Sequence, residues 1–84
     1  MKKIWDDKAW EDYLYWQLHD KAMLKRLNAL IRDVERSPFH GIGKPEPLKG
    51  DKSGFWSRRI NDEHRLVYRV TNGMLEIASC KDHY

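Results

Sequence analysis

The chain contains one cysteine, Cys80, so it cannot form an internal disulfide and has too few thiols for a zinc cluster. It also lacks any apolar run near the roughly 18 residues that a membrane span requires. Its opening residues, MKKIWDDKAW, are broken by charges too early for a signal peptide. We therefore expect a protein of a reducing compartment, the cytoplasm, with no membrane association and no metal or other cofactor.

The length of the chain argues against a second domain. With 84 residues, it suits one domain whose small core uses most of the apolar side chains. No internal repeat or low-complexity segment interrupts it. We expect residues 1–84 to form a single domain.

Charge is only slightly unbalanced, with 16 basic and 13 acidic side chains and a net charge of +3. Residues 44–69 are locally basic, because they hold seven lysines and arginines against four carboxylates. A basic field of this kind favours a polyanion such as RNA. An ordinary solvated surface explains the same composition equally well.

Two amphipathic helices are expected in the first half of the chain, after a short strand at residues 2–5. Asp6 and Asp20 are of a type that caps helix N-termini. The helix after Asp6 has the apolar positions Ala9, Trp10, Tyr13, Leu14 and Leu18. The helix after Asp20 has one apolar stripe, formed by Met23, Leu24, Leu27, Leu30, Ile31 and Val34. Its polar side carries Lys25, Arg26, Arg32, Asp33 and Arg36, and it ends at Ser37-Pro38.

Beyond residue 54 the apolar period changes to two, which indicates strands in FWSRRI, HRLVYRV and MLEIASC. Thr71-Asn72-Gly73 is a strong hairpin signal between the last two. The alternation turns Leu66, Tyr68 and Val70 toward the helices and turns Arg65, Val67 and Arg69 away from them. We predict an α+β domain in the order βααβββ, with an antiparallel sheet and both helices packed on one face.

A long connection joins the second helix to these strands. It holds all three prolines and four of the five glycines, between residues 38 and 54, which predicts a constrained path. Within it, Pro45 and Pro47 stiffen the backbone on both sides of Glu46. Two interpretations of Glu46 stay open from the local sequence, a general base and an exposed loop glutamate.

Arginines gather on two predicted neighbouring strands, at Arg58, Arg59 and Arg65. If their side chains face outward, the guanidinium groups converge, and the fork of an arginine suits a phosphate. Pairing with nearby acids such as Asp62 or Glu63 is the alternative.

The chain ends on His83 and Tyr84, although large aromatic groups are unusual at a disordered terminus. We therefore expect this end to be held against the domain. Histidine titrates nearest neutrality, so His83 is a candidate proton donor, with a structural role as the alternative. Tyr84 is suited to stack on a base or to close the edge of the core.

Four segments together resemble the YoeB toxin family, within the larger RelE group. They are GKPEPLK at residues 43–49, SGFWSRRI at 53–60, HRLVYRV at 64–70 and the terminal HY. The resemblance covers nearly the whole chain, in order and at the family's spacing. It implies a microbial-ribonuclease-like fold, commonly as a homodimer, and a ribosome-dependent endonuclease that cleaves messenger RNA in the ribosomal A site and inhibits translation. It also implies a YefM-like antitoxin whose C-terminal segment wraps the toxin and disables the site.

The resemblance also implies roles for individual residues. Glu46 corresponds to the general base, Arg65 to the phosphate-binding stabiliser and His83 to the general acid. The remaining matched positions are Lys49 and Arg59 in the basic cleft and Tyr84 beside the acid. No metal is required, because RNA carries its own nucleophile and the enzyme needs to add only a base, cations and an acid.

Two other functions are compatible with the composition. A basic α+β domain can bind RNA or an antitoxin-like peptide along its sheet without catalysis, with the terminal residues merely packing. A DNA-binding repressor is less well supported, because both predicted helices are needed to cover the core and neither has the pattern of a recognition helix.

Overall fold

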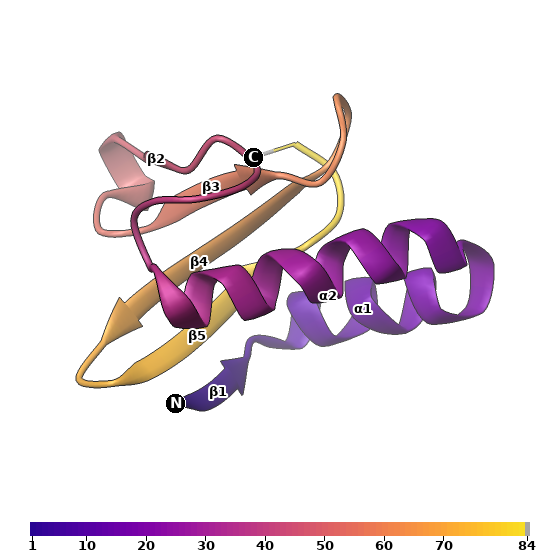
Figure 1. Ribbon diagram of the computed structural model, residues 1–84, viewed down its shortest axis with the longest axis horizontal. Helices are drawn as coiled ribbons and strands as arrows, with labels where there is room; N and C mark the ends of the chain where they lie inside the picture. The colour runs from indigo at the N-terminus through magenta and orange to yellow at the C-terminus, as the bar shows by residue number, and fades with distance from the viewer. Residues whose placement is uncertain (84) are drawn as a thin grey trace.

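Two helices and five strands make up the computed structural model, which describes residues 1–83 (Figure 1). In chain order the elements are β1 (Lys2–Trp5), α1 (Asp7–His19), α2 (Lys21–Arg36), β2 (Glu46–Pro47), the 3-10 helix η1 (Gly50–Lys52), β3 (Trp56–Arg59), β4 (Arg65–Thr71) and β5 (Met74–Ser79). The predicted α+β class is confirmed. Asp20 caps α2 as predicted, since its side chain accepts a hydrogen bond from the amide of Met23.

The strands form one sheet in the order β1-β5-β4-β3-β2. Strands β3, β4 and β5 make the predicted antiparallel meander, and Asn72 and Gly73 both have the positive φ of a tight hairpin turn. Strand β1 differs from the prediction because it pairs with β5 in parallel, so the sheet is mixed. Alternation identifies a strand but not the direction of its partner, which here follows from the path of the chain through the two helices.

The proline-rich connection contributes a strand that its composition does not predict. In β2, Glu46 lies opposite Ser57 and Pro47 lies opposite Trp56. This strand is at the edge of the sheet, where a residue without an N–H is tolerated. Glu46 is therefore fixed by strand pairing and not only by its flanking prolines.

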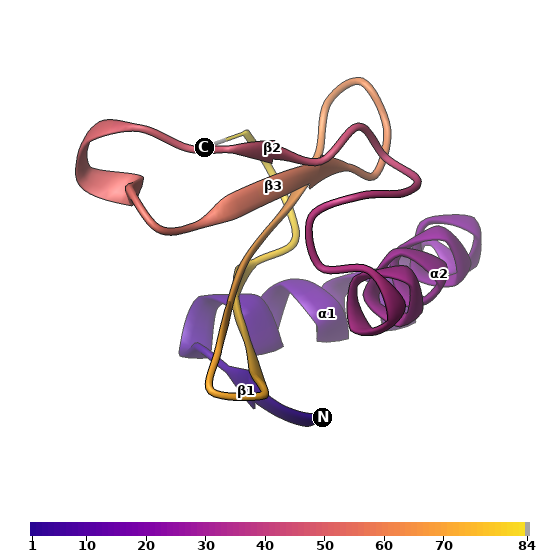
Figure 2. The same ribbon diagram turned by 60° about the vertical axis from the view of Figure 1, so that its left-hand side comes forward.

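Both helices pack on the same face of the sheet (Figure 2). The predicted stripe of α2 is confirmed, since Leu27, Leu30, Ile31 and Val34 are buried. They meet Leu66 and Tyr68 of the predicted inner face of β4, together with Leu75 and Ile77 of β5. These side chains form one core between the two layers.

The predicted inner face of α1 is only partly correct. Its buried residues are Ala9, Asp12 and Trp16, whereas Leu18 is 79% exposed. Trp10 is half exposed and stacks on Tyr13 instead of entering the core. The helix is rotated because Asp12 and Trp16 make buried hydrogen bonds to the C-terminal segment, and the apolar pattern of the helix does not encode these bonds.

Arg58 does not face outward, so it cannot converge with Arg59 and Arg65 on a phosphate. Arg58 lies opposite Leu66 and is fully buried on the helix side of the sheet. Its Nη1 donates to Asp33 Oδ2 at 2.6 Å, and its Nε donates to the hydroxyl of Tyr68 at 3.2 Å. Asp33, which the pattern of α2 turns toward solvent, instead provides the opposite charge that a buried guanidinium requires.

The guanidinium of Arg58 also fixes the start of the long connection. It donates to the carbonyl oxygens of Ser37 at 2.6 Å, His40 at 2.8 Å and Ile42 at 3.2 Å. The chain must pass close by, and a Cβ on Gly41 would lie 2.0 Å from Asp33 Oδ2. The buried charge therefore sets the course of the connection that leads to Glu46.

We predict that Arg58→Met lowers the free energy of unfolding by about 3–5 kcal/mol, because it takes the guanidinium donor from Asp33 and from several carbonyls. Urea unfolding followed by tryptophan fluorescence measures this loss. Arg26→Met removes an exposed arginine from α2 and should change stability by less than about 0.5 kcal/mol. Equal stabilities of the two variants would contradict the structural role of Arg58.

The same cluster predicts a dependence of stability on pH. The amide of Ile42, together with the guanidinium groups of Arg58 and Arg36, lowers the pKa of the Asp33 carboxyl from 3.8 to about 2. A lowered pKa stabilises the fold above 3.8, and this contribution is lost as the pH falls toward 2. Urea midpoints of the wild type and Asp33→Asn should therefore differ near neutrality and converge in that acidic range. A difference that stays constant down to pH 2 would show that the charge of Asp33 does not matter.

Candidate functional site

Strand register places three of the predicted site residues on one face of the sheet. Glu46 lies opposite Ser57, and Arg59 lies opposite Arg65 on the neighbouring strand pair. Paired residues point to the same face, as do residues two apart along a strand, so Ser57 and Arg59 share a face. Glu46, Arg59 and Arg65 therefore all lie on the face opposite the helices, with the carboxylate one row of side chains from the arginine pair.

Arg65 is held by the turn that precedes its strand. Its Nη1 donates to the carbonyl oxygens of Asn61 at 2.7 Å, Asp62 at 3.1 Å and His64 at 3.2 Å, and the residue is only 7% exposed. These partners are backbone carbonyls and not the carboxylates of the acidic neighbours. They orient the guanidinium without neutralising its charge, as an anion-binding group requires.

The other two predicted cations are exposed. The backbone amide of Arg59 donates to the carbonyl of Gly43 at 2.6 Å, which ties β3 to the long connection. Lys49 directly precedes η1, in the link between β2 and β3. The structure therefore places both near the connection that carries Glu46, with their charges on the protein surface.

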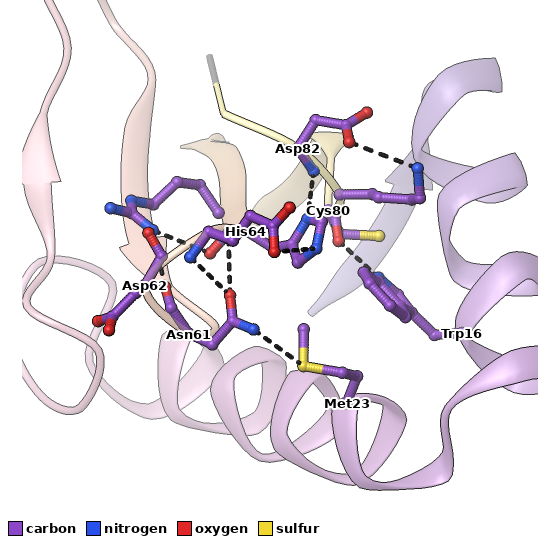
Figure 3. A network of polar contacts seen from close by, with 10 residues as sticks. Trp16, Met23, Asn61, Asp62, His64, Cys80 and Asp82 are labelled. Carbon is purple, nitrogen blue, oxygen red and sulfur yellow. Dashed lines mark hydrogen bonds and ion pairs between the residues drawn. The ribbon is translucent and has the colours of Figure 1, made fainter.

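The C-terminal segment is tied to α1 by buried polar groups. The amide of Cys80 donates to Asp12 Oδ2 at 3.0 Å. Nε1 of Trp16 donates to the carbonyl of Cys80 at 2.8 Å (Figure 3). Lys8 also bonds to Asp12, at 2.8 Å. These contacts show that the chain is held against the domain as far as Cys80.

A second pair of hydrogen bonds brings the segment to β4. The amide of Arg65 donates to the carbonyl of Asp82 at 3.1 Å, and the amide of Asp82 donates to Nδ1 of His64 at 2.7 Å. His83, which is exposed, follows directly, so the candidate acid lies next in the chain to a residue bonded to Arg65. The predicted position of Tyr84 lies outside the described residues.

Sequence analysis missed the residues that hold the site together. Asp12 and Trp16 lie on α1, and His64 precedes β4. Asp12 offers the one available signal, because an acidic residue that a helix buries must have hydrogen-bond partners elsewhere in the fold. For His64, the pattern of the strand does not reveal a role as a hydrogen-bond acceptor.

Cys80 is a small buried group, as its place in a strand pattern indicates. Burial, and then the negative charge of Asp12, raise the pKa of its thiol to about 12, so it is not a nucleophile near neutrality. Among residues 1–83, no three His, Cys, Asp or Glu side chains gather as a metal site. Neither helix in this part of the chain has the length and apolar character needed to cross a bilayer.

A model of the YoeB-like toxins of bacterial type II toxin-antitoxin systems matches residues 5–84. Toxin YoeB of Escherichia coli K12 is 61% identical over 84 residues, which is 100% of both chains. The chain belongs to the YoeB-like toxin family. The resemblance that four short segments suggested is thereby confirmed, and the protein is a toxin of the type II toxin-antitoxin class.

Solved structures agree with this YoeB-like assignment. A YoeB/ParE toxin from Agrobacterium tumefaciens has a TM-score of 0.97 and 52% identity, with 100% of both chains covered. A YoeB-YefM complex from Staphylococcus aureus has a TM-score of 0.93 and 47% identity, with 100% of this chain and 98% of that chain covered. A YoeB dimer from the same species is also known. Endoribonuclease HigB of Proteus vulgaris is a more distant relative, 28% identical over 64 residues that make up 70% of each chain.

We predict that Trp16→Phe lowers the free energy of unfolding by about 1–3 kcal/mol, because it leaves the carbonyl of Cys80 without its donor. Amide exchange at residues 80–82 should become faster in the same variant. Trp10→Phe, which changes a half-exposed ring, is the matched control. A variant with the stability and exchange rates of the wild type would show that this hydrogen bond does not hold the segment.

Proposed function

We propose that the protein is an endoribonuclease that cleaves messenger RNA in the ribosomal A site and so inhibits translation. One observation carries the proposal. The amide of Asp82 donates to the ring of His64 and the amide of Arg65 donates to the carbonyl of Asp82, so the residue before His83 lies beside Arg65, whose cross-strand neighbour is Arg59. Membership of the YoeB-like family and the relationship to an endoribonuclease support the same reading.

The proposed reaction uses the RNA's own 2'-hydroxyl as the nucleophile. Glu46 takes the proton of this hydroxyl as its oxygen forms a bond to the neighbouring phosphorus. The bond from phosphorus to the 5'-oxygen breaks, and His83 gives a proton to that leaving oxygen. The products are a 2',3'-cyclic phosphate and a 5'-hydroxyl. The balance of atoms and protons needs no metal and no other cofactor.

Positive charge stabilises the phosphorane-like transition state in this scheme. Arg65 is the central group, because carbonyls hold its guanidinium in place before the substrate arrives. Preorganised donors of this kind lower the barrier more than mobile ones, since no reorientation is needed during the reaction. Arg59 and Lys49 add charge at the surface, where they attract and position the RNA backbone. Tyr84 is assigned here to stacking beside the acid.

The pairing of β2 supports the proposed role of Glu46 as a base. Its backbone is held between two prolines and against Ser57, so the carboxylate is delivered from a stiff edge strand. A base must lie within hydrogen-bond reach of the proton that it removes, and rigid placement lowers the entropic cost of that geometry.

The partners follow from the same assignment. We propose the ribosome as the site of action and a YefM-like antitoxin as the inhibitor, with a homodimer as the assembly and the cytoplasm as the compartment. The Staphylococcus aureus relatives, solved as a YoeB-YefM complex and as a YoeB dimer, support these partners. Residues 1–84 act as one toxin domain in this proposal.

We predict that Glu46→Gln and His83→Ala each lower the rate of messenger-RNA cleavage on translating ribosomes by roughly a hundred- to ten-thousand-fold, the usual contribution of an acid or base. Binding to ribosomes should change little, because the arginines remain. Glu11→Gln and His19→Ala alter exposed residues of α1 and should cleave normally. Wild-type cleavage by either site variant would remove that residue from the mechanism.

Mapping the product ends separates this enzyme from a non-catalytic RNA- or peptide-binding module. The proposed chemistry leaves a 2',3'-cyclic phosphate on the upstream fragment, whereas a module that only binds yields no such end. Binding to RNA without any cyclic product, under conditions in which the ribosomes translate, would contradict the proposal.

A further inference from the structure

His64 contacts both halves of the candidate site. Its ring nitrogen Nδ1 accepts the amide of Asp82 at 2.7 Å, and its backbone carbonyl accepts from Nη1 of Arg65 at 3.2 Å (Figure 3). One residue therefore joins the segment that carries His83 to the guanidinium of Arg65. The reaction scheme above assigns it no role.

The direction of the hydrogen bond at the ring is fixed by chemistry. A backbone amide can only donate, so Nδ1 of His64 must present its lone pair to Asp82. The proton of the neutral ring is then on Nε2, which lies 3.8 Å from the carboxylate of Glu63. His64 thus acts as an acceptor, which a phenyl ring of similar shape cannot do.

The ring of His64 is held on its other sides. It lies edge-on against Trp16, with ring centroids 4.8 Å apart and planes at 75°. Its backbone amide donates to Oδ1 of Asn61 at 2.7 Å, and its carbonyl also accepts from Ile60 at 3.0 Å. The acceptor atom therefore has a defined position before the C-terminal segment docks against it.

The more distant anchors do not fix the end of the chain by themselves. Asp12 and Trp16 hold Cys80, which is three residues before His83. Three extended residues span up to about 10 Å, so a chain held only at Cys80 could place an imidazole over a wide range. The bonds of Asp82 to His64 and Arg65 remove most of this freedom.

We propose that His64 is a positioning residue, which holds Asp82 through Nδ1 and thereby sets the distance between His83 and Arg65. This inference rests on the proposed function, because the distance matters only if both groups act on one phosphate. A misplacement of about 1 Å at a reacting group can cost a hundredfold in rate. Docking of the segment is then part of the catalytic geometry.

Two substitutions separate the ring from the acceptor. His64→Phe keeps a ring against Trp16 but removes the acceptor, whereas His64→Asn loses the ring and keeps an oxygen near the place of Nδ1. His64→Gln, whose amide corresponds to the place of Nε2, is a polar variant with the acceptor displaced. His40→Phe is the matched control, because the side chain of His40 is exposed and only its carbonyl bonds to Arg58.

Three measurements are made on the full chain. NMR gives the exchange rate of the Asp82 amide proton with water. Single-turnover cleavage at saturating ribosome complex gives the maximal rate, and titration gives the affinity for the programmed ribosome. We expect His64→Phe to speed Asp82 exchange at least about tenfold and to slow maximal cleavage about a hundredfold, with affinity nearly unchanged. His64→Asn should recover most of both losses, and His40→Phe should match the wild type.

Wild-type exchange in His64→Phe would overturn the inference while leaving the nuclease intact. Faster exchange with an unchanged maximal rate would also overturn it, because loosening of the segment would then have no effect on cleavage. If His64→Phe does not fold, His64→Asn is compared with His64→Gln. Equal maximal cleavage rates for these two variants would count against the positioning role. Cleavage by His83→Ala at the wild-type rate would instead remove His83 from the mechanism, and the positioning role with it, whereas absence of cleavage by the wild type would reject the proposed function.

Discussion

The buried charge of Arg58 is the constraint on which most of the structure depends. An unpaired guanidinium in the interior would cost more than a small domain can tolerate, so this core forms only with its partners in place. Asp33 supplies the opposite charge, and the carbonyls of Ser37, His40 and Ile42 supply acceptors. The proline-rich connection must therefore close around the core, and its path to Glu46 is a consequence of folding.

The C-terminal segment follows the same physical rule. Asp12 brings a carboxylate to a buried position on α1, where it accepts the amide of Cys80. Trp16 fills the core with its ring and donates to the same residue. In both cases a polar group on a helix must be satisfied, and the group that satisfies it belongs to a segment without regular structure. A small domain thereby holds in place both the connection that leads to the candidate base and the segment that carries the candidate acid.

Much of the fold follows from local pattern. The single stripe of α2 and the period-two strands β3 to β5 are decided by which residues are apolar, and the structure agrees with them. The errors have one cause. Leu18 is exposed, Arg58 is buried and β1 runs parallel to β5, because each of these depends on contacts between distant segments that the local pattern does not contain. A periodicity argument counts apolar residues and cannot foresee which polar residues will be paired inside.

For the site, the sequence by itself determined the family and named Glu46, Arg65 and His83, because four short segments at the right spacing are specific. It also predicted that the chain end would be held, since aromatic residues are rarely left in a loose terminus, and the described segment is held as far as Asp82. Only the tertiary structure decided that strand register puts Glu46 on the same face as the Arg59 and Arg65 pair, and that His64, Asp12 and Trp16 hold the terminal segment. The physical reason is that a role in chemistry can be recognised from residue type and order, whereas the meeting of segments far apart in the chain is set by the pairing of buried polar groups.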